Sequence, residues 1–152
     1  MTRNELADFY HGYIDCLNHQ AWGSLGHFVH AHVTYNGSTV GLEGYRAMLE
    51  RDFREIPDLV FRIQLLVADP PTVASRLNFH VTPRGEFFGL PINGKTVTFD
   101  ENVFYELVDG KIAHVWSVID KAAIEQQLFC RAKSGAHLNS THPSTVEPGN
   151  EP

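Results

Sequence analysis

The chain has 152 residues, of which 43% are hydrophobic and 20% are charged, and its formal net charge at pH 7 is −6. This length and composition are typical of one compact domain with its own core. The acidic balance and the scattered Lys and Arg residues argue against nucleic acid as a partner. No apolar run approaches the roughly 20 residues that a membrane-spanning helix needs, so we expect no membrane partner.

The cysteines and the start of the chain predict a cytoplasmic location. Cys16 and Cys130 stand apart without a CxxC motif, and no signal-peptide pattern opens the sequence. Both features favour a reducing compartment.

The first part of the chain has the apolar spacing of helices. We expect an amphipathic helix from Asn4 to about Leu17, with Thr2 or Asn4 as its cap, and a short second helix from Trp22 to Phe28. A third helix is predicted over 41–56, with Pro57 just beyond its end. Between the second and third helices, HVTYNG predicts a short strand that ends in an Asn-Gly turn, with Asn36 at its mouth.

From Leu59 onward the apolar pattern changes to that of strands. Four strands are expected, over 59–68, 72–82, 96–108 and 111–120, with a Gly- and Pro-rich connector over 85–95. Asp109-Gly110 is a strong hairpin signal, so the last two strands should pair directly. A final helix over 122–132 closes a domain that we expect to comprise residues 1–132. The tail over 133–152 is poor in large apolar residues and is predicted to be disordered.

Helices followed by a long antiparallel sheet predict an α+β fold. We expect a cone-shaped, strongly curved and mostly antiparallel sheet, an α+β barrel, that wraps around the N-terminal helices. A pocket remains wherever the helices do not fill the concave face, and such a pocket is the usual place for a small-molecule site.

Counting outward from the Asp109-Gly110 turn places two carboxylates on one face of the last hairpin. Glu101 and Asp120 then lie diagonally across the strand pair, beside Tyr105 and Trp116. Burial and like-charge proximity would raise the pKa of both carboxyls, as a general acid or base near neutral pH requires. A β-bulge would reverse the facing of half of these side chains. Alternatively, Asp120 caps the helix that follows it.

Further candidates come from the strand over 72–82 and from the aromatic residues. Arg76, Asn78 and His80 share one face, which is either a polar pocket wall or the solvated side, and an alternative for Arg76 is a carboxylate partner across the sheet. The candidates that could line a pocket for a ring-shaped ligand, rather than pack in the core, are Trp22, Phe88, Tyr105 and Trp116.

No motif indicates metal or cofactor chemistry. The histidines of the N-terminal third lack metal-ligand spacing, and we expect them at the surface or in the core: His11, His19, His27, His30 and His32. The sequence has no GxSxG elbow, no phosphate-cradling Gly-rich loop and no HExxH. We therefore predict neither a metal nor a cofactor.

Two motifs carry a family resemblance. The similar segments are GEFFGLPINGK and FYELVDGKIAHVWSVID, together with Arg76 and the helix that ends in Gln127-Leu128. Through them the sequence resembles the SnoaL-like polyketide cyclases, also called ester cyclases. These proteins belong to the nuclear transport factor 2-like superfamily of cone-shaped α+β folds. The resemblance covers roughly Asn4 to Phe129.

The resemblance implies a cofactor-independent cyclase that closes a ring by an intramolecular aldol condensation. In the family, an aspartate at the end of the last strand is the general acid/base, and Asp120 matches that position. It would remove a proton alpha to a carbonyl of a small hydrophobic substrate. Asn36 and Glu101, with His80, are the nearest counterparts of the family's helper residues. Glu101 is a departure, because a second carboxylate repels an enolate.

Two other readings stay open. Glu101 and Asp120 could activate water, as the related limonene epoxide hydrolases do with carboxylates, or shuttle a proton as in the related ketosteroid isomerases. The chain could instead be a non-catalytic binding or dimerisation domain, since the fold alone does not fix function. We also expect a homodimer through the outer sheet face, where the predicted alternation places Phe104, Val115 and Ile119.

Overall fold

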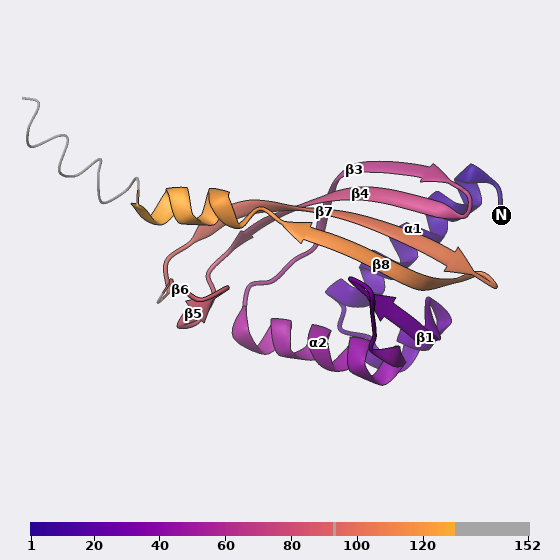
Figure 1. Cartoon of the computed structure of the whole chain (residues 1–152), viewed down its shortest axis with the longest axis horizontal. Coiled ribbons are helices and arrows are strands. Elements are labelled where there is room, and N and C mark those ends of the chain that lie inside the picture. The colour runs from indigo at the N-terminus through magenta and orange to yellow at the C-terminus, as the bar shows by residue number, and fades with distance from the viewer. Residues whose placement is uncertain (93, 130–152) are drawn as a thin grey trace, which may run out of the picture.

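The computed structural model describes residues 1–92 and 94–129, and within these residues a curved sheet covers the helices (Figure 1). The helices are α1 (Arg3–Asn18), the 3-10 helix η1 (Trp22–His27), α2 (Gly41–Glu55) and an unlabelled helix over 121–129. The strands of the large sheet are β1 (Val29–Tyr35), β2 (Ser38–Thr39), β3 (Arg62–Asp69), β4 (Thr72–Val81), β7 (Val97–Val108) and β8 (Lys111–Ile119). A small hairpin, β5 (Glu86–Phe87) and β6 (Leu90–Pro91), occupies part of the predicted connector.

The predicted α+β architecture is confirmed. The strand order is β2-β1-β8-β7-β4-β3, and among these neighbours only the β1–β8 pair is parallel in the part of the chain that the structure describes. The predicted tail over 133–152 and the last residues of the predicted final helix lie outside the described residues.

The first helix forms where the sequence predicts it. Thr2 is its N-cap, and a reciprocal capping box joins Thr2 to Glu5, which satisfies two backbone N–H groups that a helix start leaves free. Its apolar side turns toward the sheet and buries Leu6, Tyr10, Tyr13, Ile14, Cys16 and Leu17. The apolar side of α1 is therefore part of the hydrophobic core.

The second long helix, α2, lies below the large sheet in the view of Figure 1. It ends at Glu55, two residues before Pro57, and it buries Tyr45 and Leu49. The predicted strand over 59–68 begins only at Arg62, because Asn18 binds both the N–H and the carbonyl of Phe61 and holds that segment against α1.

The last two long strands form the expected hairpin. Asp109 and Gly110 both have positive φ, 53° and 76°, as a tight turn of this type requires. Val108 is opposite Lys111 and Leu107 is opposite Ile112.

A β-bulge then reverses the predicted register, which was wrong from His114 onward. The pairing shifts so that Glu106 is opposite His114, which leaves Ala113 as the extra residue on β8. Beyond it Glu101 is opposite Ile119, and Val103 is opposite Ser117. The inner face of β8 therefore carries Val115, Ser117 and Ile119 instead of His114, Trp116 and Val118.

Candidate functional site

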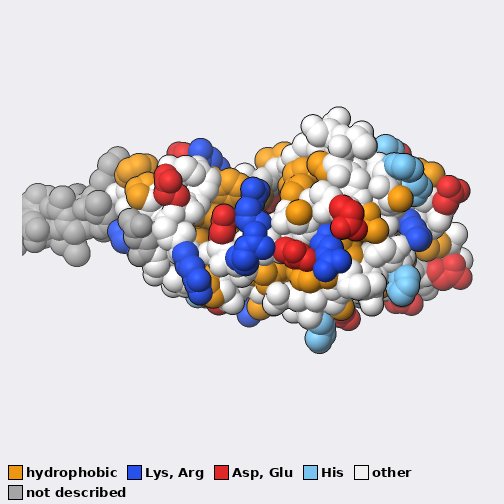
Figure 2. Space-filling view, turned by 90° about the horizontal axis from the view of Figure 1, so that it is seen from below, with side chains coloured by type: hydrophobic (Ala, Val, Ile, Leu, Met, Phe, Trp, Pro, Cys, Tyr) orange, Lys and Arg blue, Asp and Glu red, His pale blue; other side chains and the backbone are white. Residues whose placement is uncertain are grey.

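The concave side of the sheet holds a pocket. It encloses about 720 Å³ of atom-free space, part of which is open to solvent. Its lining residues come from α1, α2, the β5–β6 hairpin and the inner sheet face: Tyr13, Leu17, Tyr35, Tyr45, Met48, Leu49, Asp52, Ile56, Leu59, Phe61, Phe79, Phe87, Phe88, Phe99, Glu101, Val103, Tyr105, Val115 and Ile119. Seen from the α2 side, hydrophobic side chains are exposed among charged ones (Figure 2). A mostly apolar concavity with a few polar groups on its wall suits a small organic molecule.

Glu101 is the buried carboxyl of this pocket. It lies midway along β7, and its Oε2 accepts a hydrogen bond from Ser117 Oγ on β8. Burial raises the pKa of Glu101, the Ser117 hydrogen bond lowers it, and the nearby Asp52 raises it. Because burial dominates, this carboxyl exchanges a proton closer to neutral pH than an ordinary glutamate does.

Asp52 is a second pocket carboxyl. It lies on the side of α2 that also carries Tyr45, Met48 and Leu49. Burial raises the pKa of Asp52 to about 6, while Arg51 lowers it and Glu55 raises it. The pocket thus contains two acids that repel one another when both are charged.

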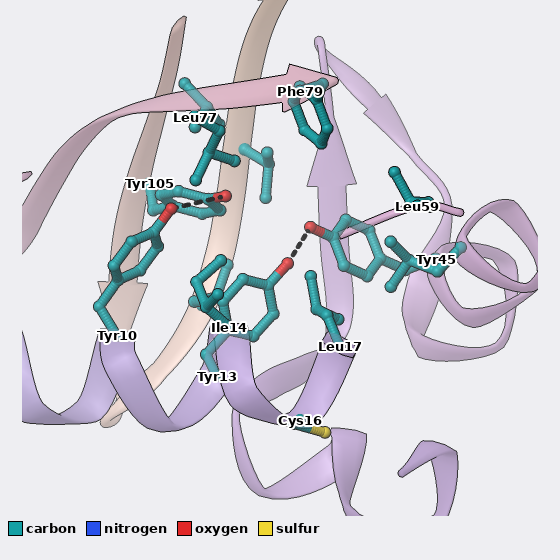
Figure 3. Close-up of a cluster of buried hydrophobic side chains, with 14 of the residues drawn as sticks. Tyr10, Tyr13, Ile14, Cys16, Leu17, Tyr45, Leu59, Leu77, Phe79 and Tyr105 are labelled. Carbon is teal, nitrogen blue, oxygen red and sulfur yellow. Dashed lines mark hydrogen bonds between the residues drawn. The ribbon is translucent and has the colours of Figure 1, made fainter. Parts of the chain in front are cut away.

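Tyrosine hydroxyls add neutral donors. The hydroxyl oxygens of Tyr13 and Tyr45 are 2.6 Å apart, and Tyr10 donates to the hydroxyl of Tyr105 across 3.4 Å (Figure 3). Burial raises the pKa of Tyr13 and of Tyr45, so both hydroxyls keep their protons at neutral pH. In the Tyr13–Tyr45 pair one hydroxyl donates to the other, which leaves one O–H free for a ligand.

Asn36 holds Ser117 from the end of β1. Its Oδ1 accepts from the Ser117 N–H at 2.8 Å, and its Nδ2 donates to the Ser117 carbonyl at 3.2 Å. The Asn36 N–H donates to the carbonyl of Val115, and its φ of 48° is left-handed. Asn36 is exposed and does not line the pocket, so it reaches Glu101 only through Ser117.

The structure brings three of the predicted residues into the pocket, namely Glu101, Phe88 and Tyr105. Asp120 is exposed and lies outside it, where its Oδ1 accepts the N–H of Ala123 at 3.1 Å. That contact is the N-cap that we stated as the alternative. The predicted common face of Glu101, Trp116 and Asp120 is therefore wrong, because of the bulge at Ala113.

The other predicted site residues lie elsewhere. Trp116 is 46% exposed on the outer sheet face, and Trp22 packs against Phe53 away from the pocket. His80 is exposed and its Nδ1 bonds to Thr98. Arg76 pairs with Asp100 at 2.6 Å, which confirms the alternative of a carboxylate across the sheet. The face of Arg76 and His80 is the solvated side, because β4 turns its apolar residues inward.

Sequence reasoning missed Asp52 and Ser117. Asp52 left a readable signal, since it continues the apolar side of the helix through Tyr45, Leu49 and Ile56. The sequence contains no such signal for Ser117, because the face on which Ser117 lies depends on the bulge.

The described ranges contain neither a metal cluster nor a membrane-spanning helix. No group of three or more His, Cys, Asp or Glu in 1–92 and 94–129 could hold a metal ion. No helix in those ranges is long and apolar enough to cross a membrane.

Comparisons with known proteins agree with the fold. The family model for SnoaL-like polyketide cyclase matches residues 7–128. The crystal structure of a SnoaL-like polyketide cyclase from Agrobacterium tumefaciens is 51% identical, with a TM-score of 0.81 over 84% of this chain and 99% of that chain. TsrD from Streptomyces laurentii (22% identity, TM-score 0.74, 84% of this chain and 97% of that one) and IdmH from Streptomyces antibioticus (20%, 0.70, 81% and 97%) share the fold. No curated protein matches the chain.

Proposed function

The chain belongs to the SnoaL-like polyketide cyclase family, and from this premise we propose that it is an acid–base enzyme with Glu101 as its proton-transferring group. Its substrate is a hydrophobic carbonyl compound in which the enzyme removes a proton alpha to the carbonyl. The resulting enolate closes a ring by attack on a second carbonyl of the same molecule.

The observation that carries this proposal is the environment of Glu101. The carboxyl lines an aromatic pocket, and within the described residues no Lys, Arg or His forms an ion pair with it. A desolvated carboxylate without a cation is a stronger base than one in water, as proton abstraction from carbon requires. Asp120 is exposed, caps the helix after β8 and does not line the pocket, so we assign the base to Glu101.

Each proton and electron pair that moves in the proposed reaction has a donor and an acceptor within the pocket. The Glu101 carboxylate takes the α-proton as the C–H bond breaks, and the electron pair moves to the carbonyl oxygen as an enolate. The free O–H of the Tyr13–Tyr45 pair is a neutral donor for that oxygen. The enolate carbon then forms a C–C bond with the second carbonyl, and Glu101 returns its proton to the alkoxide.

Deuterium exchange tests the first step without knowledge of the natural substrate. We expect the protein to accelerate exchange of the α-protons of 2-tetralone in deuterium oxide, followed by proton NMR. Because the carboxylate is the active form and burial raises its pKa, the rate should rise as pH increases through that pKa and then level off. A rate equal to that of buffer with unfolded protein would contradict the proposal.

We also propose that the functional unit is a homodimer formed through the outer sheet face. A row of paired positions crosses four strands on this face, namely Val67, Ala74, Phe104 and Trp116. Leu65 and Val118 extend the row along their strands. Phe104 is 53% and Val118 is 70% exposed, which a monomer would leave in water. Of the residues first predicted for this face, Val115 and Ile119 turn inward because of the bulge.

Sedimentation measures this association. The wild-type protein is expected to sediment as a dimer, and Phe104→Glu is expected to sediment as a monomer, because it places an unpaired charge in the proposed interface. Val60→Glu is the matched control, since Val60 is 41% exposed but precedes β3 and lies off the sheet face. A monomeric wild type would count against the dimer.

A further inference from the structure

Asp52 is an acid without a partner on the wall of the pocket. Within the described ranges its carboxylate accepts no hydrogen bond and forms no ion pair within 4.0 Å. The cation next to it in sequence, Arg51, is exposed and does not line the pocket. Glu101, by contrast, accepts from Ser117. A desolvated carboxyl that the protein does not satisfy is a place where a ligand group can bind.

The other residues that line the pocket determine which charge a bound ligand group can carry. Among the described lining residues there is no Lys, Arg or His, so nothing there would neutralise an anionic ligand. Aromatic rings instead surround the space, Tyr35, Tyr45, Phe61 and Phe88 among them. The faces of such rings carry negative potential and attract a cation.

We propose that the substrate carries a protonated amine, which the Asp52 carboxylate and the surrounding aromatic rings bind while the carbonyl faces Glu101. This assignment rests on the proposed function, because it names the class of substrate for the same pocket. Asp52 is thus a specificity-determining residue that binds the amine, while Glu101 acts on the carbon next to the carbonyl.

An ammonium group also removes an electrostatic conflict. The negative charge of Asp52 raises the pKa of Glu101 and so disfavours the charged form of Glu101. A bound cation favours the ionised form of Asp52 and offsets its repulsion of Glu101, so that both carboxyls can be charged when the substrate is present. A neutral or anionic ligand does neither.

Matched probes separate the amine from the ring that bears it. Binding of 2-aminotetralin, 2-tetralol and 2-naphthoate is measured by calorimetry, and none of these compounds has an exchangeable ketone α-proton. At about pH 8 we expect the amine to bind at least about tenfold more tightly than the alcohol, and the naphthoate to bind most weakly. Since burial raises the pKa of Asp52 to about 6, the preference should shrink as pH falls below that value and Asp52 takes up a proton.

Two variants on the same helix complete the test. Asp52→Asn should abolish the preference for the amine and leave the affinity for 2-tetralol unchanged. Glu55→Gln, an exposed neighbour on α2, should keep the preference. Equal affinities for amine and alcohol in the wild type, no binding of either, or a preference that survives in Asp52→Asn would overturn the proposal. The α-proton exchange of 2-tetralone is independent of these readouts, so a failure of the amine assignment is distinguishable from a failure of the proposed reaction.

Discussion

Replacement of Glu101 by Gln is expected to lower the rate of α-proton exchange by about 1,000-fold. Glutamine has nearly the same shape and can still contact Ser117, but it cannot accept a proton from carbon at neutral pH. The protein should therefore stay folded, and its affinity for 2-tetralone should change little. Proton NMR of exchange and calorimetry of binding separate the two quantities.

Asp120→Asn is the matched control for that substitution. Asparagine is as good an N-cap as aspartate, so the cap on the Ala123 N–H and the stability should both be retained. If Glu101 is the base, exchange by Asp120→Asn equals that of the wild type. The reverse result, an active Glu101→Gln and an inactive Asp120→Asn, would restore the role that the family resemblance implies for Asp120.

The sequence predicted the elements because their signals are local. The cap at Thr2 or Asn4, Pro57 behind α2 and Asp109-Gly110 between two apolar runs each act within a few residues. The structure has these elements within a few residues of the predicted ends. The paired arrangement of β7 and β8 followed from the turn alone.

The composition of the site could not be predicted in the same way. A strand alternates with period two, so the extra residue at Ala113 moves every later side chain of β8 to the opposite face. That single residue takes Trp116 out of the pocket and brings Ser117 to Glu101. The sequence KIAHVWSVID does not indicate the bulge. Its apolar residues lie on both faces of the strand, so the apolar pattern fits either register.

The bulge is compatible with the fold because β8 is anchored on both sides of it. Before it, the Ile112 N–H donates to the Phe28 carbonyl at 2.8 Å, and after it the Ser117 N–H donates to Asn36 at the same distance. Both contacts come from the segment that leads into and out of β1. The register that brings Ser117 to the pocket therefore depends on Asn36, a residue that never touches the ligand space.

Asn36→Ala is consequently expected to destabilise the protein by about 3 kcal/mol. Two hydrogen bonds to the backbone of Ser117 are lost, at about 1 kcal/mol each, and alanine in the left-handed conformation of Asn36 costs about 1 kcal/mol more. Asn36→Gly is the matched variant, because glycine adopts that conformation without strain and should lose only about 2 kcal/mol. Urea denaturation measures both values.

Exchange activity distinguishes a positioning role of Asn36 from mere support of the fold. Without the two hydrogen bonds from Asn36, the Ser117 hydroxyl no longer has a fixed position beside Glu101. The hydrogen bond that lowers the pKa of Glu101 then weakens. The midpoint of the pH–rate profile should then move to higher pH in Asn36→Gly, and in Ser117→Ala by the same mechanism. A profile that keeps its midpoint in both variants, with stability reduced as expected, would show that Asn36 supports the sheet and does not reach Glu101 through Ser117.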